Sequence, residues 1–187
     1  MKLELWYPLK PWIVSQGWGT NGEWYRANGI NIEGHNGLDL IATDKQAVRA
    51  AHDGEIVYAG VDSKEGWGVV LRTLEPIDSV YYKTIYWHLI KEIPVKVGTK
   101  VKAGDLIGYA DNTGFSTGTH LHFGLKPQLK GENDWTWVNL EQSNGYLGAI
   151  DPTSYFNNYF AVDAQLVISI LSSIIETYKL IINKLKI

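Results

Sequence analysis

Short runs of β-branched and aromatic residues, closed by glycine, proline, aspartate or asparagine, recur along the chain as far as residue 162. Such runs predict strands, and the residues that close them predict turns. The clearest runs are residues 55–59, 69–72, 80–88 and 105–109. No pattern of helical period precedes residue 163, so we predict a mainly β domain. The length of 187 residues suits one domain with an extension better than two domains.

Four of the five histidines stand in three short segments, residues 35–39, 87–89 and 120–122. His120 and His122 are two residues apart in a run that favours a strand, so both imidazoles should point to one face of a sheet. The chain has no cysteine, so any zinc that it binds must be held by nitrogen and oxygen. Two histidines and one aspartate, with water in the fourth position, form the open ligand set of a catalytic site.

Each of these motifs taken alone has an ordinary explanation. Two alternating polar residues on a half-exposed strand produce a His-x-His pair, and a His-x3-Asp spacing is commoner still. The flanking residues favour a divided metal site. Gly34 and Gly37 permit a tight turn around His35, and Gly114 and Gly118 make a flexible approach to the strand at His120.

The ordered set of motifs between Gly34 and Phe123 resembles the lysostaphin-type (LytM-like) zinc metallopeptidases, endopeptidases that cut peptide bonds in peptidoglycan. The matching segments are Gly34–Leu40, Val48–Gly60, Gly66–Val70, Thr84–Leu89, Val95–Tyr109 and Thr113–Phe123. They occur in the family's order, and Asp151-Pro152 and residues 16–19 match as well. The resemblance implies an antiparallel sheet with a groove that contains zinc.

Carried over position by position, the resemblance implies five site residues. Zinc would be held by His35, Asp39 and His122, and the two catalytic histidines would be His88 and His120. The nucleophile would be water, activated by zinc, and one catalytic histidine would transfer its proton while the other stabilises the oxyanion. The sequence does not assign these two roles. His52 occupies a position where the family needs no histidine, and we expect a surface or loop residue there.

Tyr86 stands two residues from His88, so in a strand its hydroxyl should share the face of that histidine. We expect it to serve packing. Residues 126–150 depart from the minimal family domain and contain Trp135, Trp137, Gly145 and Tyr146. This segment either forms a wall of the groove that shapes substrate choice or is a surface loop whose tryptophans cover the sheet. The same two alternatives, sugar stacking or core packing, apply to Trp12, Trp18, Trp24 and Tyr25.

The tail from Asp163 to Ile187 has the pattern of an amphipathic helix. Its apolar stripe recurs at spacings of four and three, at Val167, Leu171, Ile174, Tyr178, Ile181 and Leu185. Glu176 and Lys179 interrupt the apolar run, so we predict no transmembrane span. Packing on its own domain, self-association and contact with a membrane surface remain the alternatives. We predict a metallopeptidase domain over residues 1–160, with core motifs at 34–123, and the helix over 161–187.

A net charge of -3, with no basic run and no glycine-rich phosphate loop, favours no nucleic-acid partner. Residues 1–14 carry charged residues and prolines through what would be the apolar core of a signal peptide, so we expect none. A phage-type lysin, released at lysis or carried by a virion, would reach the wall without one; otherwise we predict only synthesis in the cytoplasm.

We therefore predict a zinc endopeptidase that acts on peptidoglycan. The alternative is a non-hydrolytic relative that binds cell wall or activates another hydrolase. All five positions that would carry zinc and catalysis are filled, which favours the enzyme. The sequence does not identify the bond that is cut.

Overall fold

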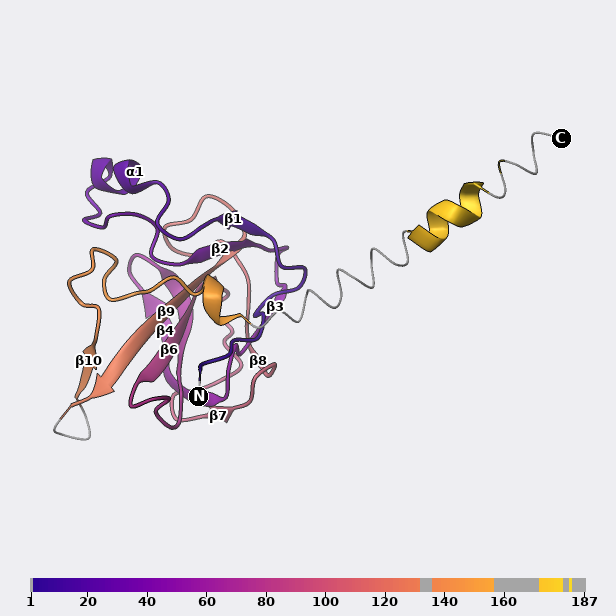
Figure 1. Ribbon diagram of the computed structural model, residues 1–187. Helices are drawn as coiled ribbons and strands as arrows, with labels where there is room; N and C mark the ends of the chain where they lie inside the picture. Colours follow the sequence, from indigo (N-terminus) through magenta and orange to yellow (C-terminus); the bar gives the residue numbers. More distant parts are fainter. Residues whose placement is uncertain (1, 132–135, 157–171, 180–181, 183–187) are drawn as a thin grey trace. The chain divides into compact units, whose positions relative to one another are not determined.

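The computed structural model describes residues 2–131, 136–156, 172–179 and 182 (Figure 1). The chain divides into two compact units, Met1–Phe156 and Asn157–Ile187, and each is described by itself. The predicted domain boundary between residues 160 and 161 lies outside the described residues and stays a prediction.

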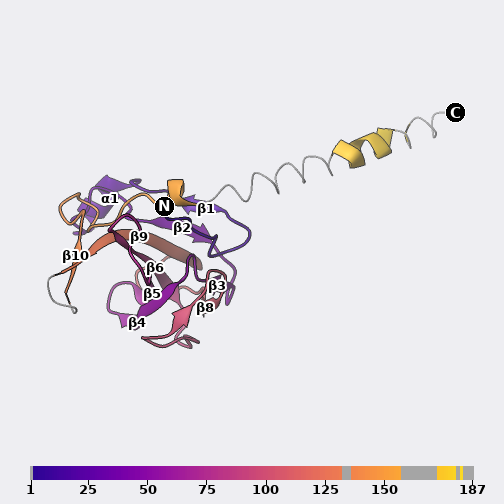
Figure 2. The same cartoon turned by 60° about the horizontal axis from the view of Figure 1, so that its bottom comes forward.

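The first unit is built on an eight-stranded sheet in which every neighbouring pair is antiparallel. The order across the sheet is β1-β2-β9-β6-β5-β4-β7, and β10 pairs with β9. Figure 2 shows the labels of β2, β9, β6, β5 and β4 in this order. The bounds are β1 Val14–Gln16, β2 Leu38–Ile41, β4 Gly54–Asp62, β5 Gly66–Arg72, β6 Tyr81–Leu89, β7 Lys100–Val101, β9 His120–Lys130 and β10 Trp137–Asn139. The predicted mainly β, antiparallel fold is confirmed.

Smaller elements complete this unit. A second sheet pairs β3 (Ala47–Arg49) with β8 (Leu106–Tyr109), and a 3-10 turn covers Thr153–Tyr155. Helix α1 (Gly22–Ala27) is an addition to the predicted elements. Its six residues are too few to produce a recognisable helical period, which is why the sequence pattern missed it.

One face of the large sheet forms the core. Leu121, Phe123 and Leu125 of β9 alternate inward and are fully buried, and Leu71 and Tyr86 pack on the same side. Trp12 and Trp18 pack against this core, so core packing is the correct alternative for these two tryptophans. The intervening residues of β9, beginning with His120 and His122, therefore belong to the opposite face.

His52 lies in the loop before β4, as expected, but it is buried and not on the surface, because only 4% of it is exposed. Its Nε2 lies 3.0 Å from the hydroxyl of Thr84, and its Nδ1 lies 2.8 Å from the carbonyl oxygen of Asp53. The Thr84 hydroxyl is also 2.9 Å from that of Tyr86. Burial lowers the pKa of His52 to about 4, so the ring is neutral in this polar network within the core.

In the second unit, residues 172–179 are helical, and over these residues the predicted C-terminal helix is confirmed. Ile174 and Tyr178 of the predicted stripe are exposed; the other four members lie outside the described residues. Lys179 and Glu176 form an ion pair of 2.7 Å one turn apart. Within the part of the chain that the structure describes, no helix is long and apolar enough to cross a membrane.

Candidate metal centre

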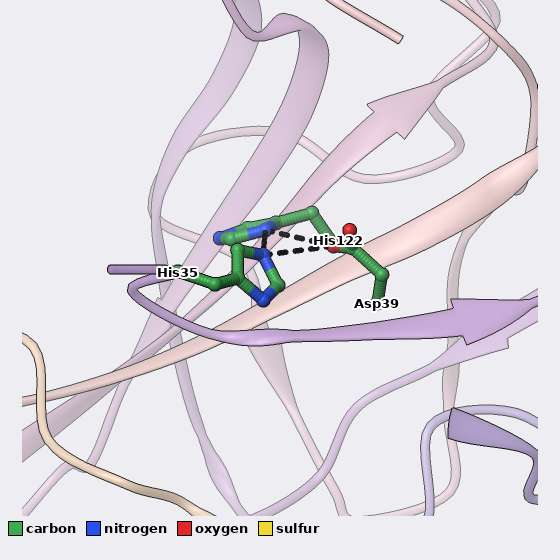
Figure 3. Close-up of side chains that lie close together, drawn as sticks. All are labelled: His35, Asp39 and His122. Atoms are coloured by element: carbon green, nitrogen blue, oxygen red, sulfur yellow. Dashed lines mark hydrogen bonds and ion pairs between the residues drawn. The ribbon is translucent and has the colours of Figure 1, made fainter. Parts of the chain in front are cut away.

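The pairing of β2 with β9 brings two of the predicted ligands face to face. Asp39 and His122 are direct partners across the two strands, although 83 positions separate them in sequence. His35 lies in the turn before β2 and reaches the same point (Figure 3). A Cβ atom on Gly37 would lie 2.6 Å from the carbonyl oxygen of Phe123 and 2.7 Å from the His122 ring. Glycine at this position therefore lets the turn close onto the ring.

Three donor atoms converge at this point. The Oδ1 atom of Asp39 lies 3.0 Å from Nε2 of His35 and 3.1 Å from Nδ1 of His122, and these two nitrogens are 2.9 Å apart. Two ligands of a tetrahedral zinc, with bonds of about 2.0–2.1 Å, lie about 3.3 Å from each other. The triangle is close to one face of such a tetrahedron, so the donor set and its spacing fit zinc. His35, Asp39 and His122 also form a group that could hold a metal ion.

The surroundings of His35 orient it for this task. Its Nδ1 lies 3.3 Å from the carbonyl oxygen of Gly17, which can only accept, so Nδ1 carries the proton and Nε2 presents a lone pair. The Gly19 amide donates to the His35 carbonyl over 2.8 Å. Hydrogen bonds with the segment at residues 16–19 thus fix the orientation of the His35 ring. Burial tends to raise the pKa of Asp39, but the neighbouring rings of His122 and His35 outweigh it and hold that pKa well below its usual range.

The two predicted catalytic histidines lie beside these three donor atoms. Their ring centroids are 4.5 Å apart, and the Nε2 atom of His120 lies 3.7 Å from Oδ1 of Asp39. The Nδ1 atom of His88 donates to the Thr113 carbonyl over 2.8 Å, and that of His120 donates to the Gly118 carbonyl over 2.7 Å. Both rings therefore present Nε2 to the site. Burial, together with His120 and His122, lowers the pKa of His88 to about 4.

His88 reaches the site because its backbone is unusual. In a regular strand Tyr86 and His88 would share a face, but His88 has φ 65°, a left-handed conformation that is rare outside glycine. Tyr86 pairs with Phe123 on the core side, where its hydroxyl accepts a hydrogen bond from the Ala51 amide at 2.8 Å. The expectation that Tyr86 shares the face of His88 is therefore wrong, whereas its expected packing role agrees with its complete burial.

A cavity of about 1010 Å³ surrounds the four histidines. Its lining includes Trp24 and Tyr25 of α1, Phe115, and Leu147 from the 126–150 segment. Leu147 therefore forms part of the groove wall. Trp137 of the same segment packs against Tyr81 and Arg72 of the sheet instead. The segment therefore both lines the groove and covers the sheet, and its effect on substrate choice stays a prediction. Trp135 lies outside the described residues.

Tyr25 is a cavity residue whose place beside the metal centre the sequence did not indicate. Its ring is parallel to that of His35, with centroids 6.2 Å apart, and its hydroxyl accepts a hydrogen bond from the Gln16 amide at 3.0 Å. Burial, followed by the charge of Asp39, raises the pKa of Tyr25 to about 12. The hydroxyl stays protonated at neutral pH and can donate a hydrogen bond to an anion. No motif spacing signals this residue, because α1 carries it to the site.

Comparison with known proteins agrees with this geometry. Residues 33–134 match Peptidase family M23. Glycyl-glycine endopeptidase ALE-1 of Staphylococcus capitis is 43% identical over 95 residues, which are 51% of this chain and 25% of the relative. Lysostaphin of Staphylococcus simulans is also 43% identical over 95 residues, 51% of this chain and 18% of the relative. This chain thus matches a quarter or less of the length of these relatives.

Two solved structures share the fold. The catalytic domain of the antimicrobial peptidase lysostaphin from Staphylococcus simulans superposes with a TM-score of 0.51 at 27% identity, over 82% of this chain and 91% of that domain. A zinc-containing peptidase from Vibrio cholerae superposes with a TM-score of 0.57 at 27% identity, over 81% of this chain and 41% of that protein.

Proposed function

This chain belongs to peptidase family M23, and we propose that it is a zinc-dependent endopeptidase that hydrolyses peptide bonds in bacterial peptidoglycan. One observation carries the proposal. His35, Asp39 and His122 direct three donor atoms to one point, each about 3 Å from the others, and two further histidines face that point with Nε2.

The proposed zinc ligands are His35 Nε2, Asp39 Oδ1 and His122 Nδ1. When bound, zinc supplies a Lewis acid and lowers the pKa of a water ligand towards about 7. The distances favour His122 over His120 as the ligand, because the His122 nitrogen is 3.1 Å from Asp39 Oδ1 and the His120 nitrogen is 3.7 Å from it.

His88 and His120 are the proposed catalytic residues. In each, Nδ1 is tied to a backbone carbonyl, so Nε2 is the nitrogen that can exchange a proton. One histidine takes the proton of the attacking water and passes it to the leaving amine. The other would donate a hydrogen bond from Nε2 to the oxygen of the scissile carbonyl, and because its Nδ1 proton is already given to a backbone carbonyl, it would do so as the doubly protonated imidazolium. The protonated hydroxyl of Tyr25 provides a further donor in the same cavity.

The substrate class comes from the relatives. ALE-1 is named a glycyl-glycine endopeptidase, and a glycine-rich cross-bridge is therefore the first substrate to test. Self-association or membrane contact of the C-terminal helix, and release at lysis or carriage on a virion, stay predictions. Analytical ultracentrifugation with and without lipid vesicles tests the first pair.

The proposal is tested on intact peptidoglycan with glycine-rich and direct cross-links. The protein is incubated with each wall in zinc, in chelator, and in chelator followed by zinc, and released fragments are identified by mass spectrometry. We expect new amino termini that disappear with chelator and return with zinc. The exposed Lys91→Met variant is the matched control and should release the same fragments. Sedimentation of the protein with the wall, without release of fragments, would replace the proposal with the non-hydrolytic alternative.

A further inference from the structure

Three cationic residues form a row across the sheet on the face that carries the metal centre. Arg72 of β5 is the direct partner of Lys83 on β6, and Lys83 is the direct partner of Lys126 on β9. Lys126 follows His122 by four residues on the same strand. Because side chains alternate along a strand, both belong to one face, and the partners of Lys126 share it.

The spacing places this row at a defined distance from the proposed reaction centre. Four strand residues separate His122 from Lys126, which corresponds to about 13 Å along the strand. An extended peptide covers the same distance with about four residues. Lys126 contacts the wall of the cavity, because its Nζ donates to the carbonyl oxygen of Leu147, a cavity-lining residue, over 2.7 Å.

The row has an electrostatic cost that acidic neighbours offset in part. Glu55 of β4 is the direct partner of Arg72, and its charge acts to raise the pKa of that residue. The charge of Glu65 acts to raise the pKa of Lys126. Like charges directly opposite each other on neighbouring strands destabilise a sheet. Burial, together with Arg72, lowers the pKa of Lys83. Burial, and then Lys83, lowers the pKa of Lys126 to about 8. Among the described residues, Lys83 forms no ion pair, although it is the middle member of the row.

The two ends of the row are held in place by neighbouring groups, and Lys83 stands between them. The Arg72 guanidinium lies 3.6 Å from the centre of the Trp137 ring, and Tyr81 contacts the same ring edge-on at 5.0 Å. Lys126 is tied to Leu147 at the other end. Held side chains lose little conformational entropy when they bind, so the arrangement is suited to an anion.

We propose that Arg72, Lys83 and Lys126 bind a free carboxylate of the peptide substrate, about four residues from the scissile bond. The inference rests on the proposed function, because it takes the peptide to run from the metal centre along β9. A carboxylate would neutralise the repulsion within the row and form charge-assisted hydrogen bonds with its cations. Substrates that carry an amide at this position would lack both gains.

The test compares two probes, N-acetyl-hexaglycine with a free carboxylate and the same peptide with a carboxy-terminal amide. Binding is measured by calorimetry on the full-length protein in chelator, and cleavage is measured on the zinc-loaded protein. We expect the acid to bind about tenfold more tightly, with a KM lower by a similar factor and an unchanged kcat. Lys83→Met and Lys126→Met should abolish this preference, whereas Lys91→Met, which removes an exposed charge outside the row, should keep it.

Methionine preserves the aliphatic stem and relieves the repulsion, so both variants should melt at or above the wild-type temperature. Equal affinity for acid and amide, or a preference that survives in both row variants, would overturn the inference. Loss of the preference in Lys91→Met would overturn it too, because the effect would then be one of general charge. A preference in binding without any cleavage would refute the proposed function and leave the carboxylate site standing. Cleavage of both peptides with equal KM would overturn the carboxylate site and leave the proposed function standing.

Discussion

Acidification from pH 7.5 to pH 4 should weaken the fold through His52, the histidine outside the metal centre. The ring is buried between Thr84 and the Asp53 carbonyl, and its pKa is lowered from 6.5 to about 4. The unfolded chain therefore takes up the proton first as the pH falls. Stability from the neutral ring is complete above pH 6.5, declines as the pH drops, and is lost at about pH 4.

The magnitude follows from the two pKa values. At 1.36 kcal/mol per pKa unit, a change from 6.5 to about 4 corresponds to about 3 kcal/mol of unfolding free energy. This is a large fraction of the 5–15 kcal/mol that typically stabilises a domain. The pKa of His88 is lowered in the same way and adds its own pH dependence, so the His52 contribution must be isolated by a variant.

His52→Gln is the appropriate variant, because glutamine keeps an amide that can bond to Thr84 and does not titrate. Urea unfolding, followed by tryptophan fluorescence in chelator, gives the free energy at pH 7.5, 6, 5 and 4. At pH 7.5 the variant should be less stable by about 1 kcal/mol. Between pH 7.5 and pH 4 the wild type should lose about 3 kcal/mol more than the variant.

Parallel pH profiles for wild type and His52→Gln would refute the reasoning. They would mean that the pKa of His52 is the same in the folded and unfolded chains, which contradicts the expected effect of its burial. An NMR titration of the His52 ring protons gives an independent result, and a midpoint near 6.5 in the folded protein would contradict the argument directly.

Three further predictions concern the metal centre. Alanine at any of the proposed ligands should abolish both zinc content, measured by elemental analysis, and activity. In contrast, His88→Ala and His120→Ala should retain zinc and lose about 10²–10⁴ in kcat. Zinc loss in His120→Ala with zinc retention in His122→Ala would reverse the assignment of the pair. Gly37→Ala should lower zinc affinity, because its Cβ would collide with the Phe123 carbonyl and the His122 ring. The control Gly118→Ala, where a Cβ meets nothing within 4 Å, should bind zinc normally. Equal zinc affinities of the two variants in a titration would contradict the role of Gly37. Tyr25→Phe should keep zinc and lower kcat about tenfold through loss of one hydrogen-bond donor to the developing anion, and an unchanged kcat would exclude that role.

The local pattern of the sequence determined the class of fold and the inventory of the site. Runs of β-branched and aromatic residues bounded by turn residues, such as 80–88 and 105–109, depend on local composition, and they predicted strands that the structure contains as Tyr81–Leu89 and Leu106–Tyr109. The His120-x-His122 pair could be placed on one face because side chains alternate along a strand. The ligand set itself was inferred from resemblance, as an ordered series of motifs.

Only the tertiary structure decided which distant groups meet. Asp39 and His122 become partners through the register of β2 with β9, and no local pattern specifies a register between strands so far apart in sequence. The positive φ of His88 turns its ring away from the face that alternation assigns, and burial converts His52 from an expected surface residue into a neutral core residue. Tyr25 reaches the cavity on a helix too short to leave a periodic signal. Conformation within a strand follows from short-range sterics and polarity, whereas the convergence of side chains depends on packing between segments that the linear pattern does not relate.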